Sequence, residues 1–218
     1  MVNLIQFGFP LGIGDRQQLN RQYVTNHSSA TNFSKEVQEF INTEIQHGAL
    51  LGPFPAPPHD QFHCSPMMTR PKDGNKRRVI VDLSYGEATV NGVTIRNSYE
   101  DTEFNLQLPS LDHVLYQVFR LNHPKLVKAD ISRAFRNVPI DPRDAIKCDI
   151  TFQNQFYVDK FLVFGSVNGT MKSQNISDAI RHMLRQDGMV VWNYIDDAFA
   201  AWEAEGSYSK FSDMCQLM

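Results

Sequence analysis

Two apolar, strand-like runs meet at a pair of adjacent carboxylates close to the end of the chain. The runs are MVVWNYI (189–195) and AFAAW (198–202), and Asp196 and Asp197 connect them. Runs of this length and composition predict buried β-strands, so we expect a hairpin with both aspartates at its tip. Because a protein buries charge only beside a partner or a metal, this tip is expected at a rim of the sheet.

A third carboxylate, Asp130, ends another strongly apolar run, KLVKAD (125–130). If this strand and the hairpin are neighbours in one sheet, Asp130 converges with Asp196 and Asp197 at one rim. The three carboxylates would repel each other there unless divalent cations neutralised them, which is the arrangement that two-metal phosphoryl transfer requires. Mg²⁺ suits such a site because it prefers oxygen ligands and uses few carboxylates beside substrate phosphates.

The aspartate doublet alone carries little information, because adjacent aspartates occur by chance in about half of chains of this length. The pattern aromatic-x-Asp-Asp between two apolar strands, here starting at Tyr194, is roughly tenfold rarer. Asp130, with Phe135 five residues further on, makes chance a poor explanation. We therefore predict catalytic carboxylates, with a structural role for Asp196 as the alternative.

Composition places the chain among ordinary globular proteins. Hydrophobic residues make up 42% of the sequence and charged residues 21%, which excludes collagen-like, coiled-coil and fully disordered chains. No apolar stretch approaches the ~18 residues that span a membrane, and the opening MVNLIQFGFPLGIGD lacks the basic segment of a signal peptide. The three cysteines form no Cys-x-x-Cys pair, so we expect reduced thiols, no zinc site and an intracellular location, cytoplasmic or nuclear.

Basic residues are concentrated in one short segment. The net charge of −3, taken alone, argues against binding to nucleic acid. Residues 70–78, however, contain five basic side chains and a single acidic one. Phosphate binding is therefore expected from this segment, and a solvated hairpin face is the alternative for each of its basic residues.

The first part of the chain predicts one helix followed by a break. SKEVQEFINTEIQ (34–46) has helical periodicity, and GPFPAPPHD (52–60) contains four prolines, which predict an extended linker or a turn. We therefore divide the chain into an N-terminal extension, 1–60, and a larger region, 61–218.

The larger region predicts alternating strands and helices. Strands are expected at 64–70 and 77–84, with a turn at Asp73-Gly74 between them. Ser110 is expected to cap a helix with a buried apolar face. That face contains Leu111, Val114, Leu115, Val118 and Phe119. Further strands at 148–153 and 155–164, and a helix at 171–186, complete the prediction.

Several of these segments resemble signature motifs of reverse transcriptases, in the order of that family. KADISRAF (128–135) and YIDD (194–197) resemble the two motifs with the catalytic aspartates. FGSVNG (164–169) and SDAIRHMLRQ (177–186) resemble the loop and helix beneath template and nucleotide, and SPMMTRPKDGNKRRVIVDLS (65–84) is similar to the fingers hairpin. Segments that resemble the DIRS-like, tyrosine-recombinase retrotransposons are NLIQFGFPLG, NHSSA, GALLGPF, RRVIVDLS, DISRAFRNVPIDP and NYIDD. The resemblance covers nearly the whole chain.

The resemblance implies a metal site and a nucleotide site. At the metal site, two Mg²⁺ or Mn²⁺ ions would be bound by the side chains of Asp130, Asp196 and Asp197 and by the backbone carbonyl of Ile131. At the nucleotide site, the residues implied are Lys72, Arg78, Phe135 and Gly165, and Lys76 and Arg77 would contact nucleic acid.

The implied roles at the nucleotide site differ in their chemistry. Phe135 would exclude a 2′-hydroxyl by contact, with a place in the core as the alternative. Arg78 and Lys72 would hold the triphosphate. Gly165 would let the backbone approach the nucleotide closely.

In two places the sequence departs from the family pattern. Lys172 and Ser173 stand where the family usually has an apolar or aromatic residue, which puts the packing of that helix in doubt, although Gln174 is kept. The short stretch after Asp197 has no room for a thumb, so thumb and ribonuclease H segments are expected only downstream in a full-length element.

We therefore expect an α+β fold, a fragment of a right-hand polymerase with fingers and part of a palm, in which helices back a small antiparallel sheet and the thumb is missing. The expected activity is that of an RNA-directed DNA polymerase, a nucleotidyltransferase in which a primer 3′-hydroxyl attacks a deoxynucleoside triphosphate. An RNA or DNA template with its primer would be the partner, and no membrane is involved.

Two alternatives to polymerase activity stay open. The chain could be a decayed or domesticated remnant that binds nucleic acid or a protein partner without catalysis. It could also be another two-metal nucleotidyl enzyme such as a cyclase, although the fingers-like segment argues against this.

Overall fold

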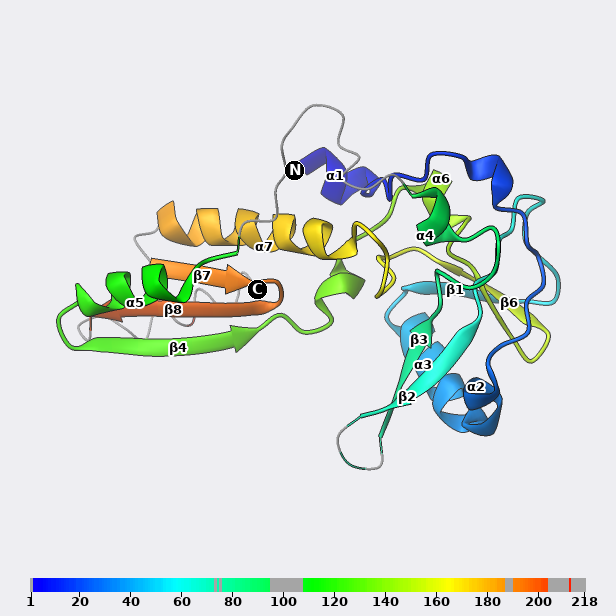
Figure 1. Ribbon diagram of the computed structural model, residues 1–218, viewed down its shortest axis with the longest axis horizontal. Coiled ribbons are helices and arrows are strands. Elements are labelled where there is room, and N and C mark those ends of the chain that lie inside the picture. The colour runs from blue at the N-terminus through cyan, green and yellow to red at the C-terminus, as the bar shows by residue number, and fades with distance from the viewer. Residues whose placement is uncertain are drawn as a thin grey trace. The chain divides into compact units, whose positions relative to one another are not determined.

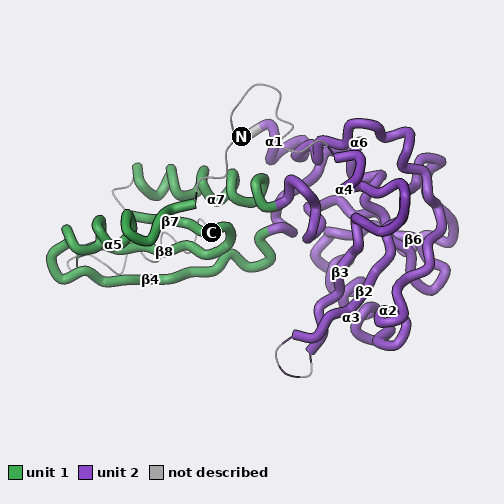
Figure 2. The backbone as a smooth tube through the Cα atoms, in the orientation of Figure 1, with its two compact units in different colours: residues 1, 102–134, 170–218 green, residues 2–101, 135–169 purple. Residues whose placement is uncertain are grey.

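The computed structural model describes residues 2–72, 74, 76–94, 108–186, 190–203 and 212 (Figure 1). The chain forms two compact units that are interleaved in sequence (Figure 2). Unit 1 contains residues 102–134 and 170–218, and unit 2 contains residues 2–101 and 135–169. The units therefore do not coincide with the predicted regions 1–60 and 61–218.

The elements of unit 1 are α5 (Leu111–Phe119), β4 (Pro124–Asp130), α7 (Gly169–Gln186), β7 (Val190–Tyr194) and β8 (Asp197–Glu203). The strands form an antiparallel sheet in the order β4-β8-β7. The predicted neighbourhood of the 125–130 strand and the C-terminal hairpin is thus observed. Asp130 pairs with Asp197, and each preceding residue of β4 pairs with the next residue of β8, back to Pro124 with Glu203.

Helix α7 packs on one face of this sheet. Successive residues of a strand point to opposite faces, and the residues that share a cluster with α7 are alternate ones. The cluster contains Leu184, Val191, Ala200 and Trp202, with Val127, Ala129 and Ile180 packed against it. The predicted helix at 171–186 is therefore confirmed, and it backs the sheet through its apolar stripe.

Helix α5 begins where the sequence predicts, but its apolar side chains are not buried. The Ser110 hydroxyl caps the helix by accepting a hydrogen bond from the His113 amide at 3.2 Å. Leu111 is nevertheless 71% exposed and Phe119 82%, and no residue of α5 is buried among those described. Helical periodicity fixes which side chains share a stripe, but it does not determine whether another surface covers that stripe. The prediction of a buried face was therefore wrong.

The elements of unit 2 are α1 (Val2–Phe7), η1 (Arg16–Gln18), α2 (Ser28–Asn32), α3 (Ser34–Gln46), β1 (Leu50–Phe54), β2 (Met67–Pro71), β3 (Arg77–Val81), α4 (Val90–Val93), α6 (Pro142–Ala145), β5 (Ile150–Phe152) and β6 (Gln155–Asp159). The short helix η2 (Ala134–Asn137) spans a division in the sequence, because Ala134 belongs to unit 1 and residues 135–137 belong to unit 2. No helix in the described part of the chain is long and apolar enough to cross a membrane.

Unit 2 contains a hairpin and a three-stranded sheet. The hairpin is β2–β3, as predicted, although Asp73 of the expected turn lies outside the described residues. The sheet has the antiparallel order β1-β6-β5. The start of the proline-rich segment, predicted as linker or turn, belongs to β1, which pairs with β6 with an irregular register between Leu51 and Phe54. Proline is tolerated there because β1 is an edge strand.

Ionised side chains are buried inside unit 2. Arg136, 13% exposed, donates hydrogen bonds of 2.8 Å from Nε to Glu44 and from Nη1 to Asp159. These contacts join η2 to α3 and to the end of β6. Removing one partner of such a group would leave an uncompensated buried charge, so the triad fixes the position of η2.

Candidate active site

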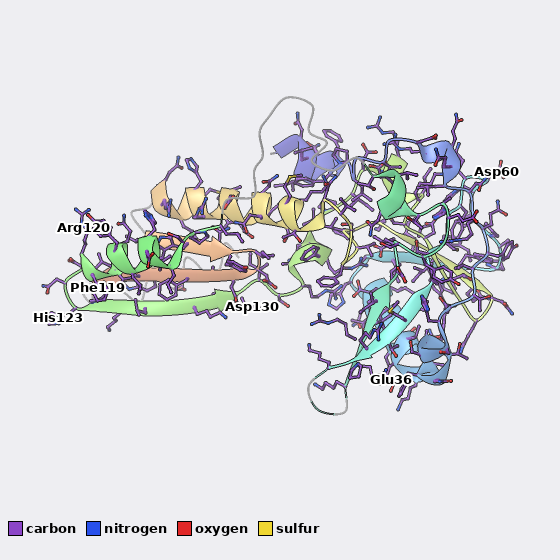
Figure 3. The ribbon with its side chains drawn as sticks, in the orientation of Figure 1. Glu36, Asp60, Phe119, Arg120, His123 and Asp130 are labelled. Atoms are coloured by element: carbon purple, nitrogen blue, oxygen red, sulfur yellow. The ribbon has the colours of Figure 1, made fainter. Side chains whose placement is uncertain are left out.

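The carboxylate residues lie at one end of the sheet in unit 1. Asp130 is the last residue of β4, at the opposite end of the strand from His123 (Figure 3). Because Asp130 and Asp197 are directly paired across antiparallel strands, their side chains share one face of the sheet. Val127 and Ala129 belong to the other face, which packs on α7, so the two carboxylates face away from that helix.

Asp196 lies in the turn between β7 and β8, one residue before Asp197. Its backbone carbonyl accepts a 2.8 Å hydrogen bond from the amide of Ile131, which ties the turn to the residue after Asp130. The structure therefore brings all four predicted metal-site residues to the same end of the sheet, where β4 ends and β7 turns into β8. Their common location follows from strand register and needs no side-chain contact.

The set of oxygen ligands at this end of the sheet suits a hard cation. It consists of carboxylate oxygens and a peptide carbonyl, which Mg²⁺ and Mn²⁺ prefer. In the described part of the chain, no three His, Cys, Asp or Glu side chains are grouped closely enough to hold a metal ion. The Asp197 carboxylate instead forms an ion pair with Lys128, whose Nζ lies 2.9 Å from Oδ1. This hydrogen bond, together with the charges of Asp197, Asp130 and Asp196, raises the pKa of Lys128.

The turn that contains Asp196 is held by polar groups of α7. Ile195 has φ = 57°, a left-handed conformation that is a genuine outlier for a β-branched residue. Its amide donates a 2.7 Å hydrogen bond to Gln174 Oε1, and its carbonyl accepts one of 2.6 Å from the Ser177 hydroxyl. Gln174 and Ser177 are both buried. Together they fix a strained residue directly before a predicted metal ligand.

A further hydrogen-bond acceptor on α7, Asp178, connects this helix to β7. Asp178 Oδ1 accepts hydrogen bonds from Gln174 Nε2 at 2.9 Å and from Asn193 Nδ2 at 3.0 Å. Sequence reasoning assigned no role to Ser177 or Asp178. The sequence signal that could have indicated such roles is the occurrence of polar residues at the positions of α7 that face the sheet. The unusual residues Lys172 and Ser173 are both buried and lie within the regular helix, so they do not prevent it from forming.

The basic residues of segment 70–78 are divided between the two faces of the β2–β3 hairpin. Arg70 pairs with Arg78, and the Lys72 amide donates to the Lys76 carbonyl at 2.9 Å, which extends the ladder by one pair. Alternation therefore places these four cations on one face. Arg77 pairs with Pro71 and belongs to the opposite face.

Arg77 takes part in packing within the fold. Its guanidinium carbon lies 3.6 Å from the centroid of the Phe33 ring, and its Nε donates a 2.9 Å hydrogen bond to the Thr69 hydroxyl. The sequence grouped Arg77 with Lys76 as a nucleic-acid contact. In the structure its guanidinium is already engaged, whereas Lys76 and Arg78 are exposed.

Three predicted nucleotide-site residues lie close together. The rings of Phe135 and Phe164 are edge-to-face with centroids 5.4 Å apart, and the Arg78 guanidinium carbon lies 5.7 Å from the Phe164 centroid. Gly165 follows with φ = +95°, and a Cβ added to it would meet no atom within 4 Å. The conformation therefore favours glycine, and the space beside it is open. Phe164 is 53% exposed, and the sequence motif 164–169 included it without indicating a role for its side chain.

Solved structures similar to this chain include two of prototype foamy virus protease–reverse transcriptase. One, a selenomethionine-labelled CSH mutant, has a TM-score of 0.65 and 18% sequence identity over 95% of this chain. The chain has a reverse-transcriptase-like fold. The native form of the same viral protein has a TM-score of 0.62 and 17% identity over 96% of this chain.

The reverse-transcriptase-like chain spans about a quarter of each viral protein, 25% in both comparisons. No protein-family model matches the sequence, and no curated protein matches it significantly. The expected α+β fold of a right-hand polymerase fragment, with antiparallel sheets and helices, agrees with these similarities.

Proposed function

We propose that the chain is the fingers and partial palm of an RNA-directed DNA polymerase from a DIRS-like retrotransposon. The observation that carries the proposal is the pairing of Asp130 with Asp197, with Asp196 in the adjoining turn. This pairing brings together two residues that are 67 positions apart in the sequence, at one end of the sheet and on the face away from α7. A purely structural role would give no reason to gather acidic residues there.

In the proposed reaction a primer 3′-hydroxyl attacks the α-phosphorus of a deoxynucleoside triphosphate, and pyrophosphate leaves. Two Mg²⁺ or Mn²⁺ ions, held by Asp130, Asp196, Asp197 and the Ile131 carbonyl, would supply the charge that activates the hydroxyl and stabilises the leaving group. Gln174 and Ser177 keep the Asp196 turn in place through Ile195. A cation held at Asp197 Oδ1 would compete with Lys128 Nζ, which forms an ion pair with that oxygen at 2.9 Å.

On the nucleotide side, Arg78 and Lys72 would bind the triphosphate from the cationic face of the hairpin. Phe135 would exclude the 2′-hydroxyl, and its contact with Phe164 gives the ring a fixed orientation. Lys76 would contact the nucleic-acid backbone. The partners are an RNA or DNA template with its primer, the location is intracellular, and thumb and ribonuclease H segments are supplied by a full-length element.

Primer extension tests the proposal. The chain, continued into the thumb segment that the proposal expects downstream and mixed with oligo(dT) annealed to poly(rA), dTTP and Mn²⁺, should extend the primer. Asp196→Asn should abolish extension, and Asp112→Asn on the exposed side of α5 should not change it. If the unmodified chain binds the duplex but never extends the primer, the non-catalytic remnant is the better description.

Phe135→Val tests the assignment of the sugar gate. It should raise the use of ribonucleotides by about tenfold or more, because excluding one group sterically is worth ~1–3 kcal/mol. Unchanged discrimination would make Phe135 a packing residue.

A further inference from the structure

The side chain of Asn91 connects three backbone or hydroxyl groups from distant parts of unit 2. Its Nδ2 donates to the Gly165 carbonyl at 3.0 Å and to the Ser84 hydroxyl at 2.8 Å. Its Oδ1 accepts from the Val167 amide at 3.0 Å. Both donor hydrogens and the acceptor are therefore in use, and two of the three bonds go to the loop after Phe164.

Asn91 is itself part of α4, which is anchored at its N-terminal end. The Thr89 hydroxyl caps the helix by accepting from the Gly92 amide at 2.9 Å, and the Asn91 amide donates to the Leu83 carbonyl at 3.0 Å. The preceding residue, Val90, is 1% exposed. The amide group of Asn91 is thus a fixed point from which the loop is positioned.

The loop in question begins at the exposed ring of Phe164. Gly165 is left-handed, the space beside it is open, and the Gly169 amide closes the loop by donating to the Ser166 carbonyl at 2.9 Å. Asn91 supplies hydrogen bonds to Gly165 and to Val167 from outside the loop, while Phe135 and Arg78 contact the Phe164 ring. A shift of Gly165 would move the adjacent Phe164 ring and its contact with Phe135.

We propose that Asn91 is a positioning residue for the nucleotide site, which sets the place of Phe164 and Gly165 and thereby the fit of a deoxynucleoside triphosphate. The inference rests on the proposed polymerase function. Asn91 reaches the nucleotide only through the loop, so it acts on binding and sugar selectivity and not on the chemistry of the carboxylates. The Asn91 bonds to Gly165 and Ser84 are solvent-exposed, so they add little to the stability of the fold.

The test compares three variants in the full 218-residue chain. Asn91→Leu removes all three bonds. Ser84→Ala removes one acceptor and leaves both loop bonds intact. Thr94→Val, the matched control, removes the hydroxyl bond from Thr94 to the Val90 carbonyl at the other end of α4. The readouts are hydrogen exchange of the Val167 amide without nucleotide, dTTP affinity in Mn²⁺, and the ratio of dTTP to UTP affinity.

Asn91→Leu should speed exchange of the Val167 amide about tenfold, weaken dTTP binding about tenfold and lower the dTTP to UTP ratio, because the loss of one bond of ~1.4 kcal/mol is a tenfold change. Ser84→Ala and Thr94→Val should change each quantity less than twofold. If the unmodified chain binds dTTP and Asn91→Leu binds it equally well, Asn91 has no positioning role and the inference is overturned. If the unmodified chain binds no dTTP, the proposed function fails as well.

Discussion

In unit 1 strand pairing places Asp130 beside Asp197, whereas in unit 2 side-chain contacts bring Arg78 and Phe135 together. Asp130 and Asp197 face each other because β4 and β8 are paired in register, and Asp196 follows from the hairpin turn. Arg78 and Phe135, by contrast, both contact the ring of Phe164 through their side chains.

This difference has a consequence for mutations. Replacing a carboxylate whose position is set by strand pairing should leave the sheet intact, because the backbone hydrogen bonds do not depend on it. Replacing a side chain that itself holds elements together should disturb its neighbours.

Arg136→Met should lower the free energy of unfolding by about 3–5 kcal/mol, because Glu44 and Asp159 would remain buried without their cation. Urea denaturation followed by circular dichroism measures the change. Arg143→Met, which removes an ion pair from a side chain that is 76% exposed, should have no measurable effect. Equal effects of the two variants would show that the buried triad does not hold unit 2 together.

Gln174→Leu should cost about 1–3 kcal/mol, because the Ile195 amide would lose its acceptor beside a buried side chain. Gln186→Leu at the exposed end of the same helix is the control. Ile195→Asn should act in the opposite direction and stabilise the chain by about 1 kcal/mol, since Asn tolerates the left-handed conformation better. A destabilised Ile195→Asn variant would mean that the turn is not strained.

The stability of unit 2 should fall in acid because of His63. Burial, with the nearby charges of Arg21 and Lys147, lowers the pKa of His63 from 6.5 to about 4. Above pH 6.5 neither state is protonated at this residue, whereas between pH 6.5 and about 4 the unfolded chain takes up a proton that the folded chain does not. The contribution of His63 is thus lost as the pH falls through this window.

The comparison uses His63→Asn, which can still accept the hydrogen bond that the Arg21 amide donates to His63 Nδ1 at 3.1 Å. Burial raises the pKa of Asp149 to about 8, so the contribution of this carboxyl to stability depends on pH in the opposite sense to that of His63. The quantity to plot against pH is therefore the difference in unfolding free energy between the parent and His63→Asn. Between pH 7 and pH 4 that difference should change by about 1–2 kcal/mol after solvent screening. A flat difference would contradict the role of His63.

The two faces of the β2–β3 hairpin should differ in nucleic-acid binding. Arg78→Ala should weaken binding to a template–primer and reduce the slope of log affinity against log salt by about 0.7–0.9, the value for one phosphate contact. Arg77→Ala should leave the slope unchanged and lower the melting temperature instead, because Arg77 packs on Phe33. The same loss of slope in both variants would remove the distinction between the faces.

The sequence predicted those features that depend on regular backbone geometry. Strand composition placed Asp130 and Asp197 at strand ends, and their convergence was predicted on the condition that the two strands are neighbours, which the structure shows. The apolar periodicity of residues 171–186 predicted α7. Gln174 and Ser177 could be located on that helix, but their bonds to Ile195 depend on how the hairpin turn meets it.

Contacts between side chains, and whether an apolar helix face is covered by another part of the fold, could not be predicted in this way. Arg77 and Arg78 are adjacent and identical in type, and only the strand register separates their surroundings. Asn91 and Phe164 show no pattern in the sequence that marks their contacts. The apolar stripe of α5 was recognised, but its exposure depends on the surfaces available to cover it.

The central claim, a metal site built from Asp130, Asp196 and Asp197, is tested most directly by the melting temperature of the chain in Mn²⁺. Titration to about ten times the Kd should stabilise the parent by about 1.4 kcal/mol through mass action. Asp196→Asn should lose most of this increment and, without metal, should melt at the same or a higher temperature, because one repelling charge is gone. Asp112→Asn should behave as the parent. A parent that is indifferent to Mn²⁺, or an Asp196→Asn variant stabilised as strongly as the parent, would contradict the claim.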